Sequence, residues 1–109
     1  MSINFGQNTG NPDFSPIYGT VDEDINIEGA WDFVTGSGVV IGIVDEGVQL
    51  THPDLLGNIR FDLGVDLALG SSGGDASLND PHGTAVGGIA AGVGNNEIGI
   101  TGVAYEADI

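Results

Sequence analysis

The chain has 109 residues, of which 40% are hydrophobic and 20 are glycine, a composition that favours one small α/β domain over a disordered segment or a coiled coil. Its formal net charge of −15, with Arg60 as the single cation, argues against nucleic acid and anionic membranes as partners. Cysteine is absent, which excludes disulfides and thiol chemistry. So many carboxylates form a solubilising surface, and clustered oxygen ligands can also hold a divalent cation such as calcium.

The first twenty residues differ in composition from the rest of the chain. They are rich in Asn, Gly, Pro and Ser and show no hydrophobic period, which predicts an N-terminal arm over 1–20 ahead of a domain over 21–109. Residues 1–10 lack the basic start and apolar core of a signal peptide. No apolar run in the chain approaches membrane-spanning length.

A short helix is predicted directly after the arm. We expect it to begin behind Asn26 as N-cap, to end near Gly36 and to bury Trp31 in the core. The apolar residues with the i, i+3, i+4, i+7 spacing of one helix face are Ile27, Ala30, Trp31 and Val34.

A buried strand, a weaker strand and a second helix follow. Residues 38–45 are a nearly continuous β-branched run, which predicts a strand buried on both faces, as in a parallel sheet. Residues 59–69 give a weaker strand signal. Asp80 as N-cap and Pro81 at the first helical position predict a helix over 82–93, whose small residues permit close packing against a sheet.

Asp45 and His82 are the candidate residues for chemistry. Asp45 ends the predicted buried strand, where open α/β sheets place catalytic groups, although from position alone it could equally form a turn. His82 lies in the first turn of the predicted helix, where the positive end of the helix dipole disfavours the imidazolium form and keeps the ring neutral, as a general base must be. A histidine that only caps a loop is the commoner alternative. Sequence spacing alone does not decide between these roles.

Three motifs follow one another along the chain. Residues 43–48 are Ile-Val-Asp-Glu-Gly-Val, residues 51–55 are Thr-His-Pro-Asp-Leu, and residues 82–91 are His-Gly-Thr-Ala-Val-Gly-Gly-Ile-Ala-Ala. This series resembles the signature of the subtilisin-like serine proteases, and the similarity extends from about Asn11 to the end of the sequence. The pair Asn95-Asn96, followed by Gly-Val-Ala-Tyr at 102–105, is similar to the kexin and proprotein-convertase branch.

The resemblance implies an α/β fold of three layers with a mainly parallel sheet, of which this chain supplies only the N-terminal part. It implies that Asp45 orients the catalytic histidine, that His82 is the general base, and that Glu46 selects basic residues in the substrate. The nucleophilic serine and the oxyanion-hole asparagine of the family lie in later segments, so this chain alone is predicted to be inactive. The expected partners are the C-terminal remainder with its serine and a protein or peptide substrate. His52 lies in a stretch that is structural in the family, and Pro81 before His82 is atypical.

The resemblance also implies a bound calcium ion (Ca2+). Its ligands would be the side chains of Asp54 and Asn96, the backbone carbonyls of Val93, Ile98 and Ile100, and Asn11 from the N-terminal arm, with Asp13 competing for that last position. Oxygen ligands drawn from separate segments suit a hard cation. Asp66 and Asp75 lie in a loop similar to an acidic loop of the convertases that could hold a second ion, but this loop differs in length and composition.

Two functions from different classes fit the sequence. The first is a serine endopeptidase of which this chain is a fragment, extracellular or periplasmic by family habit. The second is a noncatalytic calcium-binding or interaction module derived from the same fold, in which Asp45 and His82 serve no nucleophile. Only the first requires both a companion segment with the serine and a His82 that faces Asp45.

Overall fold

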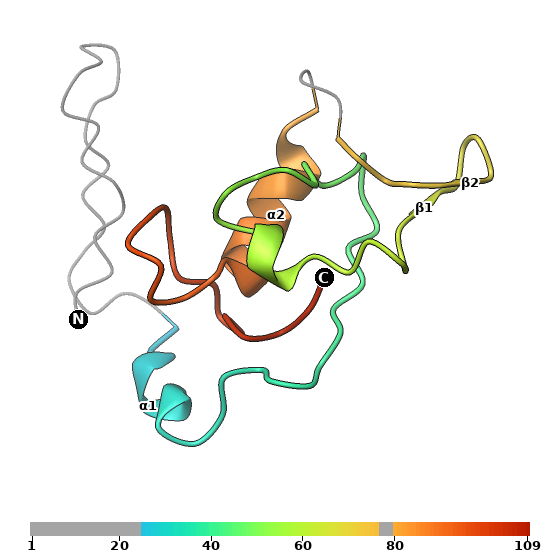
Figure 1. The fold of residues 1–109 in the computed structure, drawn as a ribbon. Helices are drawn as coiled ribbons and strands as arrows, with labels where there is room; N and C mark the ends of the chain where they lie inside the picture. The colour runs from blue at the N-terminus through green and yellow to red at the C-terminus, as the bar shows by residue number, and fades with distance from the viewer. Residues whose placement is uncertain (1–24, 77–79) are drawn as a thin grey trace, which may run out of the picture.

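The computed structural model describes residues 25–76 and 80–109, so the predicted arm over 1–20, including Asn11 and Asp13, lies outside the described residues. Along the chain the elements are α1 (Glu28–Trp31), the 3₁₀ helix η1 (Leu56–Asn58), β1 (Val65–Asp66), β2 (Ser71–Ser72) and α2 (His82–Ala91). Figure 1 shows α2 at the centre, with the loops that precede and follow it wrapped around it and the β1–β2 hairpin extending away. No helix in the described parts of the chain is long and apolar enough to cross a membrane.

The helix α2 packs through a stripe of small residues. Gly83, Gly87 and Ala91 are its buried residues, and their i, i+4, i+8 spacing places them on one face. A Cβ on Gly87 would lie 3.6 Å from a methyl of Val48 and 3.8 Å from one of Leu55. The small residues thus permit the close packing that the sequence predicts, but against neighbouring loop segments instead of a formed sheet.

The hydrophobic core of the described residues is small. It consists of Leu55, Ile59, Ala91 and Ala107, and Leu55 is the one large side chain that is fully buried. Asn58 links two segments beside this core, because its side-chain amide donates to the carbonyls of Ala91 at 2.8 Å and Tyr105 at 2.9 Å. This core joins η1 to the end of α2 and to the last residues of the chain.

The parallel sheet expected from the sequence is not confirmed. The sheet observed is one antiparallel pair, β1 with β2, in which Val65 lies opposite Ser72. The predicted strand over 38–45 is wrong for the described chain, because this segment makes only one parallel bridge, between Val40 and Asp108. A β-branched run needs paired neighbours to become a strand, and without them Val44 is 89% exposed.

Both ends of α1 differ from their predictions. The N-cap of α1 is Ile27, since Asn26 has a φ of 49°, and the helix ends at Trp31, well before Gly36. Trp31 is half-buried; its indole N–H donates to the carbonyl of Val103 at 2.9 Å. With no buried residue, α1 has little tertiary packing to extend it.

The helix α2 begins at the predicted residue, His82, and is two residues shorter at its end. Pro81 occupies the N-cap position in place of Asp80, and the helix ends at Ala91 because Gly92 has an extended ψ of 134°. The predicted strand over 59–69 is reduced to the two residues of β1, preceded by a turn.

Candidate active site

Asp45 and His82 form a direct side-chain contact, although 37 positions separate them. The Nδ1 atom of His82 lies 2.8 Å from Oδ2 of Asp45, and the other carboxylate oxygen, Oδ1, accepts the backbone N–H of Glu46 at 2.8 Å. The Asp45 side chain is 15% exposed and the His82 side chain 73%. The carboxylate is therefore held from two sides while most of the imidazole surface stays open.

Two glycines bring the two side chains together. Gly83, which follows His82, packs so closely on the turn after Asp45 that an added Cβ would lie 2.3 Å from the carbonyl oxygen of Gly47 and 3.0 Å from Cβ of Asp45. Gly47 has a φ of +118°, which residues with a side chain rarely adopt. Both positions therefore require glycine, and together they set the separation of α2 from Asp45.

The contact selects one form of the imidazole ring. An ionised carboxylate has no proton to donate, so a neutral His82 facing Asp45 must carry its proton on Nδ1 and donate it. Nε2 is then unprotonated and has a free lone pair. A ring in this tautomer can accept a proton at Nε2, and the carboxylate stabilises the positive charge that results.

The pKa of the Asp45 carboxyl group lies below its ordinary value of 3.8. The largest cause is the N–H of Glu46; the hydrogen bond from His82 acts in the same direction, and partial burial opposes both. Because the folded pKa is lower than the unfolded one, Asp45 contributes to stability above about pH 3.8, and that contribution is lost as the pH falls through the folded value.

A carbon-13 NMR titration of the Asp45 carboxyl carbon is expected to give a midpoint below 3.8. The His82→Gln variant is expected to raise this midpoint only in part, because the Glu46 N–H still donates to the carboxylate. A midpoint at or above the ordinary value in the unaltered protein would contradict the observed contacts.

Two further sequence candidates lie beside these residues. Glu46 is exposed and adjoins Asp45 through its backbone N–H. His52 lies in a different contact, in which its Nδ1 accepts the backbone N–H of Asp54 at 3.3 Å. This contact is of the structural kind expected for His52.

The loop of residues 95–101 closes around Asp54. Asp54 is 4% exposed, and its carboxylate accepts the Asn96 amide N–H at Oδ1 and the Ile100 N–H at Oδ2, both at 2.8 Å. Its backbone carbonyl accepts the N–H of Val93 at 2.8 Å. A Cβ on Gly99 would lie 1.9 Å from Oδ2 of Asp54, so the loop can approach this carboxylate only with glycine there.

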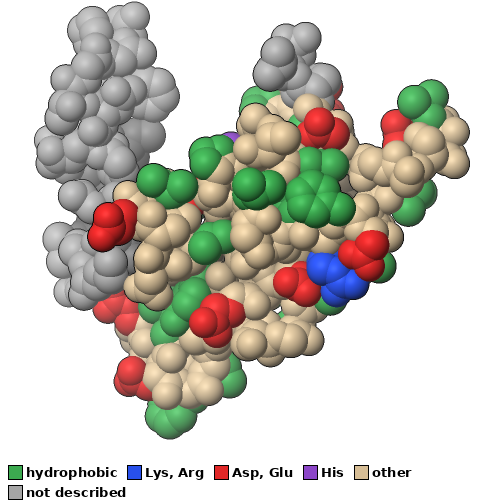
Figure 2. Space-filling model, in the orientation of Figure 1, with side chains coloured by type: hydrophobic (Ala, Val, Ile, Leu, Met, Phe, Trp, Pro, Cys, Tyr) green, Lys and Arg blue, Asp and Glu red, His purple; other side chains and the backbone are tan. Residues whose placement is uncertain are grey.

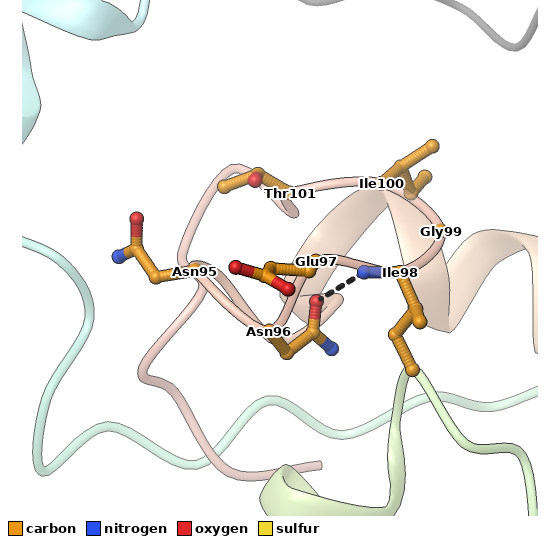
Figure 3. Close-up of a pocket in the computed structure, with 7 residues that line it drawn as sticks. All are labelled: Asn95, Asn96, Glu97, Ile98, Gly99, Ile100 and Thr101. Carbon is orange, nitrogen blue, oxygen red and sulfur yellow. Dashed lines mark hydrogen bonds between the residues drawn. The ribbon is translucent and has the colours of Figure 1, made fainter.

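Figure 3 shows this loop with Oδ1 of Asn96 facing the N–H of Ile98, a contact of 3.2 Å. Asn95, Glu97 and Gly99 all have positive φ, of 59°, 64° and 59°. For Glu97 this conformation is strained, and such strain is often found at functional sites. The loop thus has a tight winding that brings several of its polar atoms toward one carboxylate.

The calcium site predicted from the sequence centres on the Asp54 carboxylate, which in the structure meets the N–H donors of Asn96 and Ile100. Each oxygen of the Asp54 carboxylate accepts one N–H, which leaves lone pairs available. Among the described residues no cluster of three or more His, Cys, Asp or Glu side chains could hold a metal ion. Oδ1 of Asn96 accepts the N–H of Ile98, while its Nδ2 faces Asp54. Asn11 lies outside the described residues. Asp66 and Asp75 have separate partners, the N–H groups of Ala68 and Leu69 for Asp66 and that of Leu50 for Asp75.

Two side-chain contacts hold the segment that follows Asp45. Thr84 accepts the N–H of Gln49 at 2.9 Å, and Asp75 accepts that of Leu50 at 2.8 Å. The Thr84 contact spans 35 residues, and no local pattern predicts it. Thr84 does stand inside the His-Gly-Thr motif, which was the available signal.

The charge around the single cation is balanced locally. Arg60 pairs with Asp62 at 2.8 Å and with Asp108 at 3.4 Å. Figure 2 shows this one basic side chain flanked by acidic side chains. The guanidinium of Arg60 holds the pKa of the Asp62 carboxyl group below its usual value through their hydrogen bond. Its contact with Asp108 joins the segment over 58–62 to the last described residues.

Comparison with known proteins agrees with these motifs. The sequence model of the subtilase family matches residues 36–109. Human furin is 38% identical over 98 residues, which cover 84% of this chain and 12% of furin. Proprotein convertase subtilisin/kexin type 5 of Branchiostoma californiense is 40% identical over 91 residues, 79% of this chain and 5% of that protein.

A bacterial protein is also similar. Thermitase of Thermoactinomyces vulgaris is 46% identical over 80 residues, which cover 73% of this chain and 27% of thermitase. The chain thus spans between about a twentieth and about a quarter of the length of these relatives. The family match covers both Asp45 and His82, and with it the chain belongs to the subtilase family, with a similarity that leans to the kexin and proprotein-convertase branch.

Proposed function

We propose that this chain is the part of a serine endopeptidase that supplies the aspartate and the histidine of an Asp-His-Ser triad. The observation that carries the proposal is the 2.8 Å contact between Oδ2 of Asp45 and Nδ1 of His82. Asp45 holds the ring in the Nδ1–H tautomer, and His82 accepts the proton of the attacking serine hydroxyl at Nε2 and returns it to the leaving amine. Membership of the subtilase family supports these roles.

The serine belongs, in this proposal, to a C-terminal remainder of the same protease. The relatives are far longer than this chain, and the exposed apolar side chains of the described part need a cover. Val44 is 89% exposed, Leu67 81% and Val65 57%, and all three line a groove of about 670 Å³ that also contains Asp45. Without the remainder the chain lacks a nucleophile and an oxyanion hole, and we expect no hydrolysis.

A mainly parallel sheet completed by that remainder is part of the same proposal. Asp108 and Ile109 have hydrogen-bond partners on both sides. On one side the N–H of Ile41 donates to Asp108 at 2.8 Å and the N–H of Asp108 to Val39 at 2.9 Å. On the other side the N–H of Ile109 donates to the carbonyl of Asn58 at 2.8 Å, and the carbonyl of Ile109 accepts the N–H of Arg60 at 2.7 Å. The bridge between Val40 and Asp108 is parallel, which supports a parallel three-strand arrangement centred on this segment.

The substrate in this proposal is a protein or peptide, and basic residues before the cleaved bond would contact Glu46. Its exposed position next to Asp45 leaves the carboxylate accessible to a basic side chain. We propose an extracellular or periplasmic location for the protease, as the family resemblance implies.

The test of the proposed function is peptide hydrolysis by the protein that carries this chain, with and without a serine-directed fluorophosphonate. Hydrolysis that the reagent blocks, with labelling of a serine outside residues 1–109, is the expected result. If the purified protein has no such serine segment and hydrolyses no peptide, the noncatalytic interaction module takes the place of this function.

We also propose that the residues around Asp54 hold Ca2+. Its ligands would be the side chains of Asp54 and Asn96, the carbonyls of Val93, Ile98 and Ile100, and Asn11. Burial of the Asp54 carboxylate inside a glycine-dependent loop supports this assignment. The ion would neutralise this carboxylate and fasten the loop to η1, which is a structural role.

Asp54→Asn is expected to weaken calcium binding by about 10-fold to 100-fold, since it removes the one charged ligand and keeps the side-chain shape. Isothermal titration with calcium chloride measures the affinity. Asp62→Asn is the matched control, because Asp62 is an exposed carboxylate bound to Arg60 and has no part in the loop. Equal affinities in the two variants would remove Asp54 from the site.

A further inference from the structure

The segment that follows Asp45 is held from two directions. Three consecutive backbone N–H groups alternate between two segments: Val48 donates to the carbonyl of Gly74 at 2.9 Å, Gln49 to Oγ1 of Thr84 at 2.9 Å, and Leu50 to Oδ1 of Asp75 at 2.8 Å. Successive N–H groups of an extended segment point to opposite sides. The first and third therefore face one loop, and the second faces α2.

The loop side of this arrangement is made by residues 73–76. Val48 and Asp75 form a parallel bridge, and the N–H of Ala76 donates back to the carbonyl of Val48 at 3.2 Å. A Cβ on Gly47 would lie 2.9 Å from the carbonyl oxygen of Gly74. This loop therefore presses directly on the turn that carries Asp45.

The helix side is made by the first turn of α2. Thr84 lies two residues after His82, and its hydroxyl is the hydrogen-bond acceptor that ties this turn to the segment after Asp45. On the same side Gly83 is in close contact with the carbonyl of Gly47. Asp45 and His82 thus belong to two segments whose relative position depends on one threonine hydroxyl and one glycine contact.

We propose that Thr84 and Asp75 are positioning residues of the Asp45–His82 pair, an inference that rests on the proposed function for its kinetic part. Neither side chain takes part in the Asp45–His82 contact. Thr84 fixes the distance between α2 and the Asp45 segment, and Asp75 fixes the segment against the loop. Together they keep Nδ1 of His82 on the carboxylate, which keeps Nε2 unprotonated.

Thr84→Val removes the acceptor and preserves the shape of the side chain, while Thr84→Ser restores the hydroxyl. In the protein that carries this chain, Thr84→Val is expected to lower kcat by about 10-fold to 100-fold with little change in KM, because a small misplacement of a base costs rate more than binding. Thr84→Ser is expected to regain most of the lost rate. Asp75→Ala is expected to lower kcat by about 2-fold to 10-fold and Asp75→Asn, which keeps Oδ1, to recover it.

The tautomer of His82 gives a readout that does not depend on catalysis. Imidazole nitrogen-15 NMR of histidine-labelled protein, assigned with His82→Gln, is expected to show the Nδ1–H form in the unaltered protein and in Thr84→Ser. In Thr84→Val a part of the population is expected to shift to the Nε2–H form. Circular dichroism and the unfolding midpoint of each variant show whether the fold is retained.

Two results would overturn the proposal. One is a Thr84→Val variant that keeps both the unaltered kcat and the full Nδ1–H population. The other is an equal loss in Thr84→Val and Thr84→Ser, which would assign to Thr84 a folding role alone. If the unaltered protein hydrolyses no peptide, the proposed function fails, and the tautomer populations still decide whether Thr84 positions the pair.

Discussion

Replacing His82 by alanine in the protein that carries this chain is expected to lower kcat for peptide hydrolysis by about 10⁴-fold or more, with little change in KM. The ring removed is the one that Asp45 contacts at 2.8 Å, and no other described histidine is in that contact. Asp45→Asn is expected to cause a loss of similar size, because an amide no longer selects the Nδ1–H tautomer or stabilises the imidazolium charge. Steady-state kinetics with a peptide substrate measure both effects.

The matched control for His82 is the other histidine of the chain. His52→Gln is expected to retain most of the activity, since His52 contacts the backbone of Asp54 and lies outside the Asp45–His82 contact. Effects of the two catalytic substitutions should not add, because residues that act as a unit lose their function together. A large loss in His52→Gln with normal rates in His82→Ala would reverse the assignment of the base.

Gly83→Ala is expected to destabilise the protein by about 1–3 kcal/mol and to lower kcat by about 100-fold. The added methyl would lie 2.3 Å from the carbonyl oxygen of Gly47, which is part of the backbone and has no free rotamer. Because α2 must move away to accept it, Nδ1 of His82 moves away from Asp45 as well. Urea unfolding and peptide kinetics measure the two effects in the same preparation.

Gly29→Ala is the control for this substitution. Gly29 lies in α1, and an added Cβ there has nothing within 4 Å. The change is expected to leave the rate unaltered and to stabilise the protein by about 0.5–1 kcal/mol through helix propensity. If Gly83→Ala behaves like Gly29→Ala, the close glycine contact does not set the geometry of the site.

The proximity of Asp45 and His82 could be predicted from the sequence, whereas the contacts around them could not. Asp45 and His82 stand in the motifs quoted from the sequence, and the helix that carries His82 begins at the predicted residue and ends two residues earlier than predicted. The contacts from Thr84 and Asp75 join segments 35 and 25 residues apart. Such hydrogen bonds depend on how α2 packs against the rest of the chain, and no local hydrophobic period predicts this packing.

The sheet was harder to predict because β structure depends on neighbours more than on local residues. Residues 38–45 have the composition of a buried strand, yet they pair only through Val40, and Val39 and Val44 stay 52% and 89% exposed. The β1–β2 hairpin was not predicted, because its strands have only two residues each and lie in a glycine-rich stretch. Strand propensity thus overstated the pairing of this segment.

The contacts that join distant parts of the chain also determine how it folds. Hydrogen bonds join Trp31 to Val103, 72 residues apart, Asn58 to Tyr105, 47 residues apart, and His82 to Asp45, 37 residues apart. Each of these contacts forms only when a long loop closes, and this entropy cost slows folding. Because these contacts are non-local, we expect the described chain to fold more slowly than a helical protein of the same size.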